Sequence, residues 1–183
     1  MHGPSPLSPA NPPAAWGLDP VWDTYVKMSA SLLHQAVDKA LAPRQRTDRS
    51  NFCPEVLLFG AGRVVNRVRA LGYVVSVKDN SSAREFMLDD GTGLLSCIIF
   101  RNESMDACLL PFLSTDSAML GQLIHVGGPV DFYAGKPQLK VFFASVEHDV
   151  NGEVLFWLEV MEIHSTVLSV PFNPLIELSV SSM

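Results

Sequence analysis

Residues 86 to 100, FMLDDGTGLLSCIIF, contain the closest grouping of side chains that could do chemistry. The adjacent carboxylates of Asp89 and Asp90 suggest either a metal loop or an acid–base pair. A calcium loop needs more oxygen ligands at alternate positions and a closing Glu, and this stretch has neither. Neighbouring residues of a strand point to opposite faces, so the two carboxylates are poorly placed to act together. Gly91 and Gly93 suit the positive φ of a hairpin, and we therefore predict a turn.

The other reactive side chains form no pattern typical of catalysis or of metal binding. The histidines lack H-x-x-H and H-E-x-x-H spacing, and there is no G-x-S-x-G or phosphate loop. The three cysteines lack C-x-x-C spacing and are odd in number, which favours reduced thiols in an intracellular protein. We expect a protein that is not an enzyme and uses no metal or cofactor. The residues concerned are His2, His34, His125, His148, His164, Cys53, Cys97 and Cys108.

Composition limits the class of protein further. The chain has 183 residues, of which 48% are hydrophobic, so one domain with a sizeable core is expected. No apolar run reaches the roughly 18 residues of a membrane-spanning helix, and no secretory signal is visible. The net charge of −6 is unusual for a protein that grips nucleic acid through phosphate contacts. We therefore expect weak nucleic-acid binding by this chain alone.

The N-terminal part predicts a leader followed by a helix. Residues 1 to 15 are rich in proline and free of charge, which is typical of a disordered segment. From Val21, apolar residues recur at helical spacing, and the predicted helix covers about 20–41. Asp19 is the expected N-cap, Pro20 suits the first helical position, and Pro43 follows the end.

From Val64 onward, apolar residues alternate with a period of two, which is typical of strands. Gly72 interrupts the first strand and predicts a bulge or sharp bend there. A short helix over 116–123 is expected between the third and fourth strands. This order matches the five-stranded Greek-key barrel of an OB-fold. We predict a mainly β domain over 16–172, with the barrel between an N-terminal and a C-terminal α-helix, and a tail over 173–183. The predicted strands are 64–77, 84–89, 94–100, 124–133 and 139–146.

Residues 151–170, NGEVLFWLEVMEIHSTVLSV, carry the second informative pattern. Read as a helix over about 153–168, their apolar side chains fill more than half of its circumference. A surface helix needs an apolar arc of only roughly 100°, so the excess must be covered. A partner subunit, burial in the chain's own core and a strand are the three alternatives. The partner reading nominates Val154, Trp157, Leu158, Met161 and Leu168.

An OB-fold binds single-stranded nucleic acid by aromatic stacking and a positive groove on strands two and three and the flanking loops. Candidates at matching positions include two aromatic residues and several basic ones. Core packing, turn positions and solvated surface are the competing interpretations for each. The candidates are Phe100, Arg101, Tyr133, Lys136, Lys140 and Arg84, with Lys78 near the first turn.

Three motifs of this chain resemble the Stn subunit of the telomere-capping CST (Ctc, Stn, Ten) complex. They are Trp16-Gly17-Leu18-Asp19-Pro20-Val21, the strand 68–77 (VRALGYVVSV), and DDGTG at 89–93 followed by LLSCIIF. The DDGTG motif alone also occurs in the related middle subunit of replication protein A. Its combination with the Trp-Gly-Leu-Asp-Pro-Val element is more specific, and the resemblance extends over about 16–172.

The resemblance implies an OB-fold whose C-terminal helix packs against the Ten subunit. It also implies association with the Ctc subunit, together with recruitment of DNA polymerase alpha-primase for C-strand fill-in. The assembly would bind single-stranded telomeric DNA and protect chromosome ends, in the nucleus at the telomeric region. The alternative is the middle subunit of a replication protein A-like, general single-strand DNA-binding trimer.

Two departures from the family pattern qualify these expectations. Family members carry an aromatic at the end of strand three and a basic and then an aromatic residue on strand four. The matching positions here are Phe100, Asp131 and Tyr133, so an acid replaces the base. Strong DNA affinity is therefore expected of the assembled complex. The chain also ends after the OB-fold, like plant-type members, so functions of the winged-helix region of other members are not expected.

Overall fold

The computed structural model describes residues 13–41, 57–58, 61–101, 107–113, 119–133 and 136–173. The predicted leader lies outside these ranges except for its last residues, and the predicted tail except for Asn173. The helical elements are η1 (Pro13–Leu18), α1 (Ala30–Leu41), η2 (Ala107–Leu109), α2 (Leu110–Leu113), α3 (Gly152–Glu162) and the π-helical η3 (Ile163–Leu168). The strands are β1 (Tyr25–Lys27), β2 (Leu57–Leu58), β3 (Val64–Val65), β4 (Arg67–Asp79), β5 (Ala83–Asp89), β6 (Leu94–Phe100), β7 (Leu123–Tyr133), β8 (Lys136–Lys140) and β9 (Phe143–Val146).

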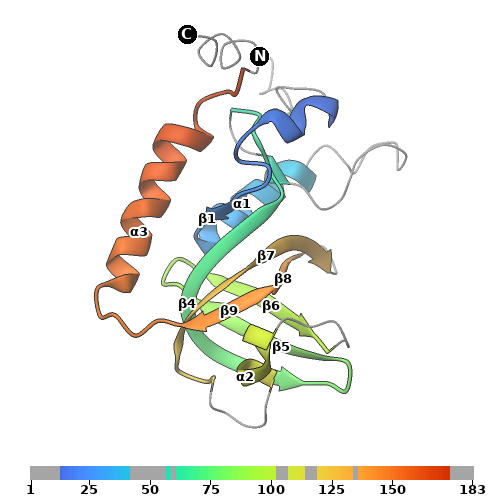
Figure 1. Cartoon of the computed structure of the whole chain (residues 1–183), viewed down its shortest axis with the longest axis vertical. Coiled ribbons are helices and arrows are strands. Elements are labelled where there is room, and N and C mark those ends of the chain that lie inside the picture. Colours follow the sequence, from blue (N-terminus) through green and yellow to red (C-terminus); the bar gives the residue numbers. More distant parts are fainter. Residues whose placement is uncertain are drawn as a thin grey trace.

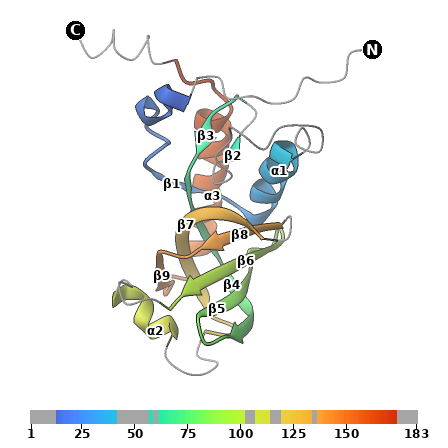
Figure 2. The same cartoon turned by 90° about the vertical axis from the view of Figure 1, so that its right-hand side faces the viewer.

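Five of these strands close a barrel, which Figures 1 and 2 show from two sides. The strand order of the large sheet is β1-β4-β5-β6-β8-β7-β9, and a further pairing of β4 with β7 completes the ring. Within the ring, β6 and β8 are parallel and the other neighbours are antiparallel. This is the connectivity of a small Greek-key barrel, and the predicted OB-fold is confirmed.

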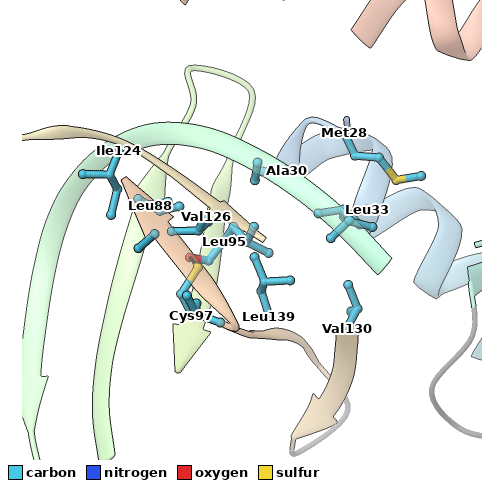
Figure 3. Packing of buried hydrophobic residues seen from close by; sticks show 14 of the residues in the cluster. Met28, Ala30, Leu33, Leu88, Leu95, Cys97, Ile124, Val126, Val130 and Leu139 are labelled. Atoms are coloured by element: carbon cyan, nitrogen blue, oxygen red, sulfur yellow. Dashed lines mark hydrogen bonds between the residues drawn. The ribbon is translucent and has the colours of Figure 1, made fainter. Parts of the chain in front are cut away.

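The barrel interior is packed with aliphatic side chains from alternate positions of the strands, as the period of two requires (Figure 3). α1 covers one end of the barrel and α2 lies at the other end (Figure 1). Met28 and Leu33 on the α1 side and Phe112 on α2 belong to the same core. The fully buried side chains from the strands include Leu88, Leu95, Ile99, Ile124 and Leu139.

Gly72 allows a close approach of two strands, and the prediction of a bulge at this residue was wrong. The register between β4 and β5 shifts further along, between Val74 and Ser76. A Cβ atom on Gly72 would lie 2.7 Å from the backbone oxygen of Asp89. The glycine therefore permits β4 and β5 to pack, and a larger residue would push them apart.

The helix predicted over 20–41 is only half present, because its first part forms a turn and a strand. The backbone N–H of Val21 donates to Asp19 Oδ1 at 3.0 Å, so Asp19 organises a turn instead of capping a helix. Tyr25–Lys27 then pairs in parallel with Arg67–Arg69 of β4. Tertiary pairing with β4 replaces the local helical preference of this segment, and α1 begins at Ala30.

The segments between the last barrel strands also differ from the prediction. The helical insert lies at Ala107–Leu113, and the residues from Met119 form a turn that leads into β7 at Leu123, where a helix over 116–123 was expected. The last predicted strand is split into β8 and β9. β8 pairs with both β6 and β7, whereas β9 pairs with β7 alone.

Candidate functional site

The DDGTG segment is a turn, and its acidic side chain fixes the start of α1. Asp90 is buried, and its Oδ2 accepts a hydrogen bond from the backbone N–H of Ala30 at 2.7 Å. Its Oδ1 accepts from Thr92 N at 2.9 Å and from Gly93 N at 3.2 Å. The backbone N–H of Ser31 donates to Thr92 Oγ1 at 3.1 Å. The turn thus satisfies N–H groups that an α-helix leaves unpaired in its first turn.

The C-terminal segment is α-helical, and one side of it packs against the barrel. α3 runs along β4 in both views (Figures 1 and 2). Phe156 and Val160 are buried against Leu71 of β4. Glu159 forms an ion pair with Lys27 of β1. The strand alternative is thereby excluded for residues 152–168.

A histidine–glutamate pair lies where α3 leaves the barrel. His125 Nε2 is 2.7 Å from Glu147 Oε2, and the His125 ring is 5.8 Å from that of Phe156. Burial lowers the pKa of His125 from its ordinary value of 6.5, which outweighs the opposing effect of the Glu147 hydrogen bond. Hydrogen bonds from the backbone of Asp149 and from His125 hold the pKa of Glu147 below its usual range. The pair ties the segment that leads into α3 to β7.

The far end of this helical segment is fastened by the Trp-Gly-Leu-Asp-Pro element. Arg63 donates from Nε to Asp19 Oδ2 at 3.0 Å and from Nη1 to the Val167 carbonyl at 3.0 Å. Its guanidinium also lies 5.6 Å from the centre of the Phe172 ring. Both members of the Arg63–Asp19 pair are nearly buried. The N-terminal motif therefore positions the end of η3.

The other side of α3 is apolar and open to solvent. Spacings of four and three residues along the helix align Val154, Leu158 and Met161 in one stripe. Sequence reasoning nominated these three but missed Leu155, because the wheel could not show which side the barrel covers. We call the four residues the α3 apolar face. Their exposed fractions are 61% for Val154, 54% for Leu155, 53% for Leu158 and 56% for Met161.

Two of the nominated partner residues lie elsewhere. Trp157 is half-buried at the side of the stripe. Leu168 is only 1% exposed and packs in the barrel core, so its nomination as a partner-facing residue was wrong. The cause is the π-helical η3, which follows α3 and turns its apolar side chains toward the barrel.

On the outer barrel face, Phe100 is 47% exposed at the end of β6. Lys140 of β8 is paired in register with Ile98, two residues before Phe100. Its Nζ lies 2.8 Å from Asp131 Oδ2. Arg101, next to Phe100, donates from Nη2 to Asp79 Oδ1 at 2.6 Å. The nominated aromatic is therefore available, but both of the cations near it are held by acids.

The other nominations on this face are less informative. Lys136 and Lys78 are exposed. Tyr133 is paired in register with Lys136 at the end of β7, and its side chain lies outside the described part of the structure.

Arg84 lies in the interior and does not fit a DNA-binding role. It is 2% exposed, and it donates from Nε to Asp79 Oδ1 at 2.8 Å and from Nη1 to the Phe112 carbonyl at 2.7 Å. These bonds anchor α2 to the barrel. Phe142, in contrast, was missed by the sequence analysis and is 53% exposed, two residues after Lys140. It was hidden inside the predicted strand 139–146, whose break at this residue has no clear sequence signal.

Neither a metal centre nor a membrane segment is found in the described ranges. They contain no group of three or more His, Cys, Asp or Glu residues that could hold a metal ion. None of their helices combines the length and the apolar character needed to cross a membrane.

The comparisons with known proteins agree with this geometry. The chain is 29% identical to CST complex subunit STN1 of Arabidopsis thaliana over 115 residues, which cover 56% of this chain and 72% of that protein. It is 23% identical to CST complex subunit STN1 of Mus musculus over 198 residues, which cover 94% of this chain and 49% of that protein. The predicted resemblance to the Stn subunit is confirmed. The chain spans about half the length of the mammalian STN1 proteins it matches. No family model matches it.

Solved structures of STN1 proteins share the fold. The yeast Stn1 and Ten1 structure matches with a TM-score of 0.68 at 13% identity, covering 88% of this chain and 83% of that one. The S. pombe Stn1-Ten1 complex matches with a TM-score of 0.62 at 16% identity, covering 80% and 95%. These proteins are subunits of a complex, in agreement with the expectation that this STN1-like chain is not an enzyme.

Replication protein A is a second relative. Its 32 kDa subunit in Arabidopsis thaliana is 30% identical over 111 residues, which cover 57% of this chain and 38% of that protein. A chain of a replication protein A heterotrimer bound to single-stranded DNA matches with a TM-score of 0.55 at 12% identity, covering 79% of this chain and 98% of that one. The two families therefore share the fold of this chain.

Proposed function

We propose that this chain is the STN1-type OB-fold subunit of a CST-like complex and that it binds a Ten1-type subunit through the α3 apolar face. The observation that carries the proposal is a helix with one buried side and four exposed, large apolar side chains on the other. An apolar surface of this kind is typical of a protein interface. The STN1 relatives, two of which were solved together with Ten1, support the choice of partner.

The size of the interaction can be estimated from the exposed side chains. Complete burial of a Val, Leu or Met side chain contributes about 1.5–3 kcal/mol. Because each of the four is already about half covered, burial of the rest contributes roughly 1 kcal/mol each, or about 4 kcal/mol in total. An interface centred on this stripe therefore has a hydrophobic core large enough to dominate binding.

The finer parts of the proposal rest on the resemblance. The assembled complex binds single-stranded telomeric DNA, protects chromosome ends in the nucleus, and engages both a Ctc-type subunit, as its third member, and DNA polymerase alpha-primase for C-strand fill-in. The outer barrel face with Phe100 is the proposed DNA-binding surface, because an exposed aromatic can stack on a base. The compensated charges of Arg101 and Lys140 support weak DNA binding by this chain alone.

A middle-subunit role in a replication protein A-like trimer is the second candidate. The 30% identity to the 32 kDa protein of Arabidopsis favours it. Mapping of the protein on chromatin separates the two roles, because the first predicts enrichment at telomeres. An even distribution along replication forks would favour the second.

The partner proposal is tested by co-expression with a Ten1-type subunit, followed by size-exclusion chromatography. The double variant Leu158→Asp, Met161→Asp places two charges in the proposed interface and should weaken binding by at least about 100-fold. Both side chains are more than half exposed, so the barrel should stay folded. Leu110→Asp on α2 is the matched control, because Leu110 is 55% exposed and lies outside α3. Co-elution of the double variant with its partner at the level of the control would refute the proposal.

A further inference from the structure

The outer barrel face neutralises its own positive charge. Lys140 and Asp131 form an ion pair at 2.8 Å, with side chains that are 30% and 35% exposed. Arg101 and Asp79 form a second one at 2.6 Å, with side chains that are 34% and 46% exposed. Both cations lie close in the sheet to Phe100, and both are accessible enough for an anion from solution to compete for them.

The register shows how the first pair sits relative to the exposed aromatic. Lys140 is opposite Ile98 in the β6–β8 ladder, and Phe100 follows Ile98 by two residues on the same face. Asp131 is opposite Gln138 in the β7–β8 ladder, which places it diagonally across from Lys140. Asp131 thus reaches Lys140 from the neighbouring strand, on the outer face that also carries Phe100.

We propose that Asp131 competes with the phosphates of single-stranded DNA for Lys140 and thereby limits the affinity of this face. The inference rests on the proposed DNA-binding function of the face. A phosphate can take the place of the carboxylate only after the 2.8 Å ion pair opens. Since Lys140 is neutralised within the chain, its contact with DNA releases fewer counterions than that of an unpaired lysine, and it adds little to the salt dependence of binding.

Asp131 is a better residue to change than Asp79. Asp79 also accepts hydrogen bonds from the buried Arg84, so its loss would disturb the anchoring of α2. Asp131 is partly exposed, and its substitution by Asn keeps the size of the side chain while removing the charge.

The experiment measures binding of a fluorescein-labelled oligothymidine of about 16 nucleotides, the upper site size of one OB-fold, by anisotropy. The full chain is used with its Ten1-type partner, between about 50 and 200 mM salt. Asp131→Asn should bind about fivefold tighter at the low salt concentration, with a slope of log K against log salt that is steeper by about 0.7. The gain should therefore shrink about 2.6-fold across this range, because fourfold more salt acts through that extra slope.

Two further variants make the test specific. Asp23→Asn changes the net charge equally at an exposed residue outside the barrel strands, and it should leave binding unchanged within about twofold. Lys140→Gln should have little effect in the wild-type chain but should abolish the gain in the Asp131→Asn background. Equal effects of Lys140→Gln in both backgrounds, or equal gains for Asp131→Asn and Asp23→Asn, would overturn the inference alone. Absence of binding by the wild type and by all variants would overturn the proposed DNA-binding face as well.

Discussion

Replacement of Asp90 by Ala removes one carboxylate that joins the β5–β6 turn to the first residue of α1. Four donors lose their acceptor: the backbone N–H groups of Ala30, Thr92 and Gly93, and the Thr92 hydroxyl. Loss of a helix cap costs about 1 kcal/mol, and each of the two partly buried turn N–H groups costs roughly another 1 kcal/mol. The hydroxyl can turn to water. The expected loss of stability is about 3 kcal/mol.

This loss corresponds to a fall in Tm of about 6–12 °C, since 1 kcal/mol shifts Tm by about 2–4 °C in a domain of this size. Thermal and urea unfolding followed by circular dichroism measure it directly. Asp89→Ala is the matched control, because Asp89 accepts a single exposed hydrogen bond, from Gly91 N at 2.9 Å. The control should lose less than about 0.5 kcal/mol. Equal losses for the two variants would refute the assignment of Asp90 as the residue that fixes α1.

Two other predictions concern stability. Gly72→Ala should destabilise the chain by about 1–3 kcal/mol in urea unfolding, because its Cβ would lie 2.7 Å from the Asp89 carbonyl oxygen. Gly17→Ala, where no atom lies within 4 Å of the added Cβ, should show less than half of that effect, and the reverse order would contradict the close-packing argument. The lowered pKa of His125 implies that its neutral form is favoured by folding, so its contribution is present above pH 6.5 and is lost as the pH falls through the lowered value. His125→Phe should therefore make the unfolding free energy less dependent on pH between about 7.5 and 5, and an unchanged dependence would show that burial of this imidazole is not the cause.

The barrel was predictable from sequence because its strands alternate cleanly and its turns carry glycine. The same alternation also held information that we did not use. Arg84 has the same parity as Phe86 and Leu88, both buried, so the pattern of β5 already placed its side chain on the inner face. Its recruitment to the DNA-binding face followed from charge alone. A basic residue on the inward parity of a strand is better interpreted as the anchor of a neighbouring element.

Other errors had no local signal to correct them. Residues 21–28 fit a helical wheel, yet Tyr25–Lys27 pairs with a strand that lies more than 40 positions later in the chain. The outward side of α3 was predictable only as an excess of apolar residues. Which residues supply it depends on how Phe156 and Val160 dock on β4, and Leu168 could not be separated from the stripe before η3 was known. Similarly, the acidic partners of Arg101 and Lys140 follow from strand register and not from spacing.

The closed ring of strands limits how another molecule can attach to this protein. Among the described strands, the large sheet ends in β1 and β9, which have three and four residues. Such short margins offer little backbone for an added strand. Recognition must therefore depend on side chains, which can change in compensating pairs while the scaffold is retained. The barrel matches yeast Stn1 closely in shape at only 13% identity, so subunits from distant species should exchange poorly even though their folds superimpose.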